Sequence, residues 1–346
     1  MQKLTSTTVT ENLKYWSVLS SSGYLGLSRF FAYSFVVLSV MLMCNSSLAQ
    51  QAQPAQQVEQ PFQLGQSSQS IQSHSSVRPG SRTQPNKSLS VGAPAIYLMG
   101  EVHDNPAIHE ARFERLKQDL GAGWRPALIM EQFDRERQTD LTQAWQTCPN
   151  AACVIKQAGG DGWNWSLYEP IIKLALQYRL PLIAGNVSRQ DASKIMRGGY
   201  EAVFDTAAQQ QLGLQRLWPE TMTTQQVQSI LDGHCGVLPE TMAMPMVQAQ
   251  RARDAMMADL IVQYAHQGVV LIAGNGHVQR DVGVYRWLPT DLLPNVTVMG
   301  FVEAGGIDFQ AYDEVIVLPA FERPDPCIAF MKMMRQSKPV AKPTKG

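Results

Sequence analysis

The chain has 346 residues, with 29 basic and 29 acidic side chains and 45% hydrophobic residues. This length allows two domains, or one large α/β domain with extra segments, and the hydrophobic content is sufficient for a substantial core. Without a basic surplus the chain is a poor candidate for binding nucleic acid, and with its long apolar run confined to the amino terminus it is not a polytopic membrane protein.

Residues 1–49 are typical of an export signal. An apolar run of 14 residues, Phe30–Met43, follows Arg29, and it is shorter than the roughly 20 residues of a membrane-spanning helix. The small residues of Ser47–Ala49 then favour cleavage, which predicts a periplasmic protein. An uncleaved anchor and an outer-membrane lipoprotein processed at Cys44 are the alternatives, and all three place the remainder outside the cytoplasm.

Residues 50–91 differ in composition from the rest of the chain. Of residues 50–90, 11 are Gln, 9 are Ser and 4 are Pro. Such a tract buries too little apolar surface to offset the entropy of ordering it, so we expect a disordered linker. Residues 92–336 are expected to form one α/β domain, and residues 337–346 a disordered tail.

Four cysteines follow the export signal, and an even number in an oxidising compartment favours disulfides. Cys148 and Cys153 flank a short loop with a turn-forming Pro-Asn pair, so we expect them to pair. Cys235 is then left for Cys327. The alternative is four free buried thiols. A zinc site is not expected, because the cysteines lack the close spacing of a zinc knuckle.

From Ala93 onward, short apolar runs alternate with amphipathic stretches. This alternation predicts an α/β fold with a largely parallel central sheet flanked by helices. The predicted strands are residues 95–99, 127–130, 181–184, 268–273, 295–301 and 314–318. The predicted helices are residues 106–120, 168–178 and 246–266, with further helical stretches around Ala192 and Thr224.

Polar residues follow four of these strands at the point where each strand ends. Ligands of parallel sheets bind beyond the carboxyl ends of the strands, so these residues mark the expected site, here called the rim. Two Gly-x-x-His motifs, each directly after an apolar strand, are more specific together than either motif alone. We expect His277 to project beyond the sheet; the alternative is that His103 and His277 only cap the strand ends and bond backbone. The rim comprises Gly100–Asn105, Glu131–Gln132, Gly185–Arg189 and Gly274–His277.

A second group of polar residues belongs to the long helix at 246–266 and to the loop before it. Gln250 and Asp254 lie on the apolar face of this helix, and Arg253, the residue before Asp254, lies next to that face. We expect this end of the helix to line the rim; the alternative is a core stripe whose polar residues bond nearby backbone. The candidate ligand-pocket residues are Gly100, Glu101, His103, Asn105, Glu131, Asn186, Arg189, His234, Gln250, Arg253, Asp254, Asn275 and His277.

Five segments resemble, in order, the ChaN family of exported haem-binding proteins, within the wider Tiki/TraB/erythromycin-esterase superfamily. The resemblance covers about residues 95–287, and implies an α/β fold with haem held at the rim between two subunits. A homodimer and an outer-membrane haem receptor are the partners it implies. The Gln-rich tract is no part of this pattern, and the residues before Cys44 do not fit a lipobox. The matching segments are GEVHDN (100–105), IMEQF (129–133), HCG (234–236), AQRARD (249–254) with Met257-Ala258, and GNGHV (274–278).

A haem carrier needs an axial ligand for iron, an apolar slot and cations for the propionates. Ferric haem outside the cell suits an anionic oxygen, so Tyr200 is the first choice as axial ligand. The other tyrosine candidates are Tyr168, Tyr264 and Tyr285, and the candidate cations are Arg189, Arg197 and Arg253.

The Tiki branch of the superfamily supplies the alternative function, because it is similar in carrying paired Gly-x-x-His motifs with a Glu. In that case His103, Glu131 and His277 hold a divalent metal that activates water, and Glu101 is the general base. The favoured expectation is a non-catalytic haem carrier in haem or iron uptake or storage. The alternative is a metal-dependent peptidase or esterase.

Overall fold

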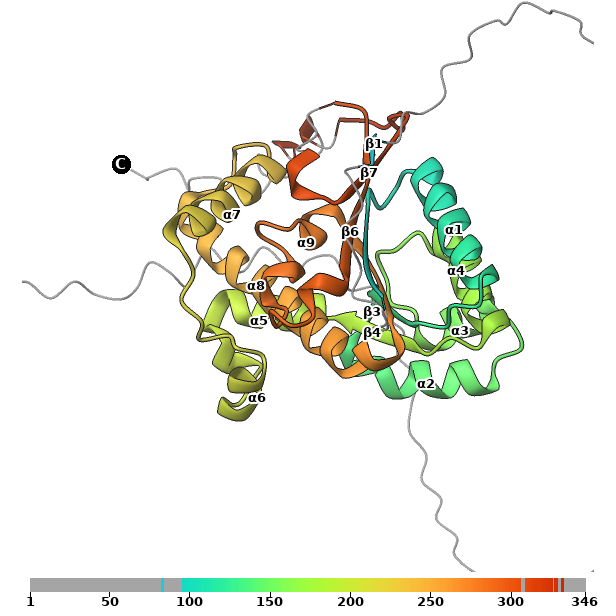
Figure 1. Cartoon of the computed structure of the whole chain (residues 1–346). Coiled ribbons are helices and arrows are strands. Elements are labelled where there is room, and N and C mark those ends of the chain that lie inside the picture. Colours follow the sequence, from blue (N-terminus) through green and yellow to red (C-terminus); the bar gives the residue numbers. More distant parts are fainter. Residues whose placement is uncertain (1–81, 84–94, 306–308, 326, 329–330, 333–346) are drawn as a thin grey trace, which may run out of the picture. The chain divides into compact units, whose positions relative to one another are not determined.

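The computed structural model describes residues 82–83, 95–305, 309–325, 327–328 and 331–332. Within these residues, seven strands form one sheet in the order β1-β7-β6-β2-β5-β3-β4 (Figure 1). Strands β2 to β7 run parallel to one another, and the short β1 pairs antiparallel with β7. The predicted α/β fold with a largely parallel sheet is therefore confirmed. The strands are β1 (Arg82–Thr83), β2 (Ile96–Glu101), β3 (Ala127–Asp134), β4 (Leu182–Asn186), β5 (Val269–Gly274), β6 (Val296–Glu303) and β7 (Glu314–Leu318).

The central strands are apolar up to the polar residues at their carboxyl ends, because both of their faces are covered. In β2, Ile96 and Leu98 pack into one buried cluster, whereas Met99 packs into another on the opposite side. Successive side chains of a strand point to opposite faces of a sheet, so a strand covered on both sides needs an unbroken apolar run. This explains why the strands were visible in the sequence.

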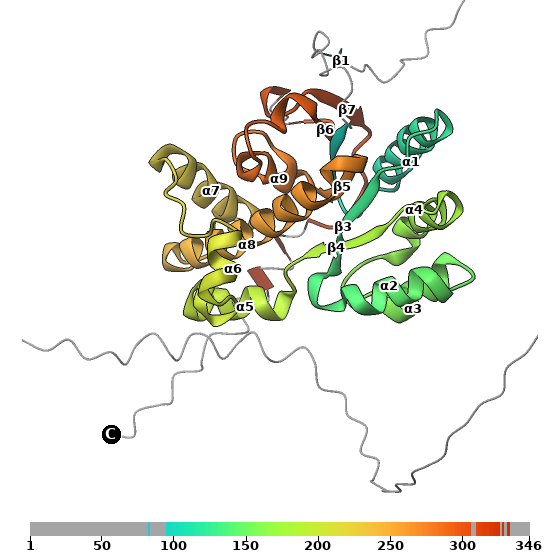
Figure 2. The ribbon, with the colours of Figure 1, turned by 60° about the horizontal axis from the view of Figure 1, so that its bottom comes forward.

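Four helices cover one face of the sheet: α1 (Pro106–Gly121), α2 (Gln138–Thr147), α3 (Ala151–Ala158) and α4 (Trp165–Tyr178) (Figure 2). In α1 the apolar face is formed by Ile108, Leu116 and Leu120, which are fully buried in the same cluster as Met99. The helix begins where Asn105 accepts hydrogen bonds from the backbone amides of residues 107 and 108. Pro106 follows as its first residue, a position where its missing N–H costs nothing.

The remaining helices lie on the opposite side of the sheet: α5 (Arg189–Gly198), α6 (Thr206–Gln211), α7 (Glu220–Gly233), α8 (Glu240–Tyr264) and α9 (Asn275–Val278) (Figure 1). The long helix α8 packs directly on the sheet through Met257 and Ile261, and α5 and α7 pack against α8. Short 3-10 turns cover Arg135–Arg137, Tyr200–Ala202, Ala265–Gln267, Val284–Trp287, Leu293–Asn295 and Phe309–Ala311.

Both expected disulfides are present, Cys148–Cys153 and Cys235–Cys327. The first does not close a plain loop, because Asn150 caps α3 and Cys153 lies inside that helix. Helices α2, α3, α6 and α9 were not expected from the sequence. The predicted export signal, almost all of the linker tract and the tail at 337–346 lie outside the described residues. Among the helices that the structure describes, none has the length and apolar character needed to cross a membrane.

Candidate functional site

The carboxyl ends of β2, β5, β3 and β4 lie next to one another at one edge of the sheet, as the rim requires. Glu101, the last residue of β2, is in register with Gly274, the last residue of β5. Asp134 at the end of β3 is in register with Asn186 at the end of β4. Two separate networks of buried charged side chains occupy this edge.

The first network surrounds the carboxylate of Glu101, which is buried. One carboxylate oxygen accepts hydrogen bonds from His103 Nδ1 at 2.8 Å, Gln132 Nε2 at 3.2 Å and the Tyr168 hydroxyl at 2.5 Å. The other oxygen forms an ion pair with the guanidinium of Arg112, and neither side chain of that pair is exposed. The buried carboxylate therefore contacts side chains from four segments of the chain.

His109 connects this network back to the loop that follows β2. Its Nδ1 accepts a hydrogen bond from Arg112 Nη2 at 3.0 Å, and its Nε2 donates to the carbonyl of His103, also at 3.0 Å. Burial lowers the pKa of His109, which favours the neutral ring that this pattern requires. Arg112 thus holds both the carboxylate that contacts His103 and the histidine that contacts the His103 backbone.

His103 itself remains accessible, with 43% of its side chain exposed. Its ring packs edge-on against Trp163, with 5.0 Å between ring centroids. Partial burial lowers the pKa of His103, which outweighs the raising effect of nearby Glu131. A neutral imidazole carries one N–H, and the contact with Glu101 places it on Nδ1, so Nε2 keeps its lone pair.

The second network centres on His277, which lies between two carboxylates. Its Nδ1 is 2.6 Å from Asp254, and its Nε2 is 3.5 Å from Glu131. Burial alone favours a neutral ring, but Glu131 and Asp254 raise the pKa of His277 to about 10. Burial likewise opposes the charge on Glu131, yet His277 lowers the pKa of this carboxyl to about 2. Glu131 also accepts the backbone N–H of Gly274 at 2.8 Å.

The expectation that His277 projects beyond the sheet is wrong, because only 7% of its side chain is exposed. Both of its ring nitrogens face carboxylates, which leaves no lone pair for a metal. Within the described part of the chain, no group of three or more His, Cys, Asp and Glu side chains is placed to hold a metal ion. The alternative metal site at His103, Glu131 and His277 is therefore unsupported.

Three buried amide oxygens at the rim have no hydrogen-bond partner among the described residues. They belong to Gln132, Asn186 and Asn275. Buried polar atoms are nearly always satisfied, so acceptors without a protein partner have room for a donor from water or from a ligand, although the Asn275 oxygen packs against Gly100. This feature supports a binding role for the rim.

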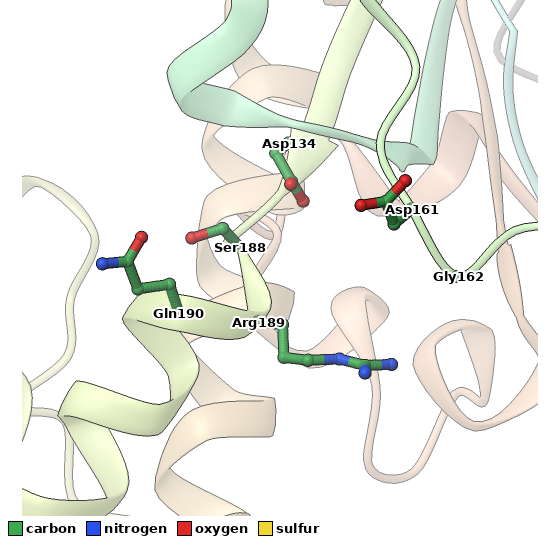
Figure 3. Close-up of a pocket in the computed structure, with 6 residues that line it drawn as sticks. All are labelled: Asp134, Asp161, Gly162, Ser188, Arg189 and Gln190. Carbon is green, nitrogen blue, oxygen red and sulfur yellow. The ribbon is translucent and has the colours of Figure 1, made fainter. Parts of the chain in front are cut away.

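Beside the rim, the structure contains an open cavity of about 290 Å³ lined by charged residues. In Figure 3 the carboxyl groups of Asp134 and Asp161 approach the space from one side, and Arg189 extends along the other. Burial raises the pKa of Asp134, and Arg253 opposes this shift. Arg253 bonds the carbonyl of Val187 and Gln250 Oε1, so two of the predicted cations and Gln250 lie on this side of the rim.

Other candidate residues have local structural roles. Asn105 caps α1, and its amide nitrogen donates to Glu303 at 2.7 Å. His234 follows α7, where its Nδ1 donates to the carbonyl of Ile230 at 2.7 Å. Gly100 packs so closely against Asn275 that a Cβ at this position overlaps the Asn275 side chain. Tyr200 is half-buried, and burial raises its pKa, although Arg251 counteracts the shift.

The residues that surround Glu101 and His103 were not predicted from the sequence in these roles: Gln132, His109, Arg112, Tyr168 and Trp163. One signal for Arg112 was present. Residues 108, 112, 116 and 120 recur every fourth position on one face of α1, and three of them are apolar. An arginine within such a stripe is buried, and a buried guanidinium requires an anionic partner.

Comparison with known proteins gives a family and a fold. A family model described as haem-binding uptake, Tiki superfamily, ChaN matches residues 92–288, more than half of the chain. A solved structure described as cofacial heme binding to ChaN of Campylobacter jejuni has a TM-score of 0.51 and 20% identity, and the match covers 64% of this chain and 86% of that chain.

More distant likenesses include an erythromycin esterase, with a TM-score of 0.37 and 12% identity over 64% of this chain and 76% of that chain. A Bacillus cereus protein has a TM-score of 0.33 and 14% identity over 64% of this chain and 72% of that chain. The comparison with curated proteins gave no match. The Campylobacter likeness supports the α/β fold, while the family match includes every strand end that contributes to the two networks. The chain therefore belongs to the haem-binding uptake family ChaN of the Tiki superfamily.

Proposed function

We propose that this protein binds haem at the rim and carries it, without catalysis, during haem or iron uptake or storage. The observation that carries the proposal is the family match over residues 92–288, which contains all of the rim. Haem is the cargo in this proposal, so the residues at the rim must provide the groups that bind haem.

The residues at the rim supply the three kinds of group that haem requires. His103 offers an accessible imidazole beside the apolar ring of Trp163, and Tyr200 remains the proposed axial ligand of the iron. Arg189 and Arg253 lie near each other and are suited to pair with propionates. Unpaired amide oxygens nearby accept hydrogen bonds from ordered water around a bound ligand.

The size of the cavity supports a homodimer as the haem-bound form. At about 290 Å³, it lies just below the roughly 300–1,000 Å³ found for ligand pockets, so one copy covers only part of a planar haem. A second copy of the chain placed against the same face covers the rest. We therefore include dimerisation in the proposal.

The two disulfides support a location outside the cytoplasm, since such bonds persist in oxidising compartments. We propose the periplasm as the site of action, with lipid anchoring through Cys44 as the alternative. An outer-membrane haem receptor is the proposed source of the cargo.

A hemin titration of the purified full chain tests this proposal. We expect saturable binding near one haem per chain, a dimer in light scattering on addition of hemin, and transfer of the haem to excess apomyoglobin. The same preparation is analysed for zinc, manganese and iron, and it is assayed for ester and peptide hydrolysis. A protein that shows no saturable hemin binding, or that turns over an ester or peptide with a stoichiometric metal, overturns the proposal.

A further inference from the structure

The segment after β7, residues 319–325, is attached to the rim at several points. Arg323 forms ion pairs with Glu303, at the end of β6, and with Asp104 of the rim. Asn105, the next residue of the rim, donates a hydrogen bond from Nδ2 to the backbone of the segment at 2.9 Å. Ion pairs between partly exposed side chains contribute little to stability, so these contacts by themselves hold the segment loosely.

The far end of this segment is held covalently. Cys327 lies two residues beyond the segment and forms a disulfide with Cys235. Cys235 belongs to the turn between α7 and α8, which pack against each other on one face of the sheet. The bond therefore fastens a segment that contacts the strand ends to a separate layer of helices.

The backbone at Cys235 is in a conformation that normally requires glycine. Helix α7 ends in a Schellman motif, in which the N–H groups of Cys235 and Gly236 bond carbonyls of the last helical turn at 2.9 Å. The left-handed position of this motif is usually glycine, but here it is Cys235, with a φ of 61°. Such a conformation persists in a residue with a Cβ only where its surroundings impose it. A need for the crosslink explains why a cysteine stands at this position.

The short disulfide offers a comparison within the same molecule. Cys148 ends α2 and Cys153 lies in α3, so after reduction these packed helices keep the two thiols close and the bond can form again. Cys235 and Cys327 are 92 residues apart. After reduction the segment relies on its weak contacts with the rim, so the effective concentration of one thiol at the other falls. Reduction of the long bond is therefore easier to sustain, and it releases a piece of the chain.

We propose that the Cys235–Cys327 bond is a redox clasp that controls how firmly the segment after β7 holds the rim. When the bond is oxidised, the segment is fixed at both ends and restrains residues 102–105. When a dithiol donor reduces the bond, the far end of the segment is released, its contacts with the rim weaken and the rim opens. The effect on haem rests on the proposed function, in which opening of the rim promotes release of the cargo.

The reduction is an ordinary thiol–disulfide exchange. A thiolate of the donor attacks one sulfur of the clasp, and the other cysteine leaves as a thiolate that takes up a proton. The second thiol of the donor loses its proton and displaces the first cysteine from the mixed disulfide. Two electrons and two protons thus pass from the donor, which becomes a disulfide, to Cys235 and Cys327, which become thiols. Residues 236–237 and 324–325, which flank the bond, are exposed, so a donor can reach it.

Hydrogen exchange of the hemin-free full chain tests the clasp itself. The variant Cys148→Ser, Cys153→Ser keeps the long bond as the one disulfide of the described residues. With dithiothreitol as the dithiol donor, we expect exchange to become about tenfold faster at residues 319–325 and 102–105 within the first minutes, while the strands of the sheet stay protected.

The matched control is Cys235→Ser, Cys327→Ser, which keeps only the short disulfide among the described residues. Its exchange at the same two segments should be fast from the start and insensitive to dithiothreitol. Both variants are then loaded with hemin and mixed with excess apomyoglobin. Dithiothreitol should make hemin transfer about tenfold faster from the variant that keeps the long bond. It should not change the rate from the control, which also accounts for any action of dithiothreitol on the haem iron.

The outcomes separate this inference from the proposed function. If reduction of the long bond leaves exchange at residues 102–105 unchanged, the clasp is wrong and the haem function stands. If the strands of the sheet exchange as fast as residues 319–325 after reduction, the bond supports the whole fold and the clasp is again wrong. If the wild-type chain does not bind hemin, the proposed function fails, whereas the exchange measurement still decides whether the clasp exists.

Discussion

At the scale of single residues, the notable feature of this molecule is a set of charged side chains that are buried at the strand ends and compensate one another. His277 is the clearest case, since its charge is compensated by Asp254 and Glu131 in a region almost without solvent. The buried charges of these three side chains are stable only while all three side chains are present. Removal of one member leaves an uncompensated charge in a low-dielectric environment.

We therefore expect His277→Ala to destabilise the fold by about 3–5 kcal/mol, the range found when one partner of a buried ion pair is lost. Urea denaturation measures this cost directly. His266→Ala is the control, and as an exposed substitution it should change the free energy of unfolding by no more than about 0.5 kcal/mol. Equal unfolding midpoints for the two variants would show that His277 is not part of a coupled charge network.

The same network predicts how stability depends on pH. The folded pKa of His277 is about 10, against 6.5 in the unfolded chain, so its contribution is complete below pH 6.5 and is lost as the pH rises to about 10. The folded pKa of Glu131 is about 2, against 4.5, so its contribution is complete above pH 4.5 and is lost as the pH falls to about 2. The free energy of unfolding of the wild type, measured by urea denaturation, should be lower at about pH 9 than at about pH 5.5. In His277→Ala this decrease should be absent.

The sequence predicted the location of the rim but not the way its residues pair. His103 and His277 share a Gly-x-x-His spacing, yet one is accessible and neutral and the other is buried and charged. The difference arises from partners on other elements, Arg112 on α1 and Asp254 on α8. Spacing along one chain does not reveal which helix face meets a strand end, so contacts of this kind could not be predicted.

At the scale of elements, prediction succeeded where burial is strong and failed where it is weak. Strands β2 to β7 each contain a mainly apolar run that is visible in the sequence. Helix α2 was missed because only Leu141 and Ala144 of its residues are buried, which leaves almost no apolar periodicity to detect. The sheet order was also not predictable, since β5 lies between β2 and β3 after a long helical insertion.

The side chain of Arg323 is one of several contacts that hold the segment after β7 close to the rim. Arg323 forms ion pairs with Glu303 at 2.5 Å and with Asp104 at 2.8 Å, and it lowers the pKa of Glu303 to about 2. Phe321 donates its backbone N–H to the same carboxylate at 3.1 Å. Because these side chains are partly exposed, the pairs contribute only about 0.2–1 kcal/mol to global stability.

Arg323→Ala should therefore loosen the segment without unfolding the protein, while the hydrogen bonds of Pro319 and Phe321 and the disulfide at Cys327 remain. We expect faster hydrogen exchange at the Phe321 amide and faster proteolysis between residues 319 and 325, with a nearly unchanged melting temperature. Lys117→Ala is the matched control, because Lys117 pairs with Glu114 on the surface of α1, away from this segment. Unchanged exchange at Phe321 would mean that other contacts hold the segment in place.

At the scale of the whole molecule, the two disulfides constrain very different lengths of chain. Cys148–Cys153 spans 5 residues between α2 and α3, whereas Cys235–Cys327 spans 92 residues that include α8 and strands β5 to β7. A crosslink stabilises a protein mainly by reducing the entropy of the unfolded chain, and this effect grows with the length of the closed loop.

We therefore expect the double variant Cys235→Ser, Cys327→Ser to lose about 4.6 kcal/mol of unfolding free energy, and Cys148→Ser, Cys153→Ser to lose about 2 kcal/mol. Each variant is the control for the other, since both remove one covalent bond and add two hydroxyl groups. Urea denaturation without reductant measures the difference. After full reduction of the wild type, its midpoint should fall below that of either variant measured without reductant. Equal losses, or a larger loss for the short loop, would show that the long crosslink acts on a part of the chain that unfolds separately from the sheet.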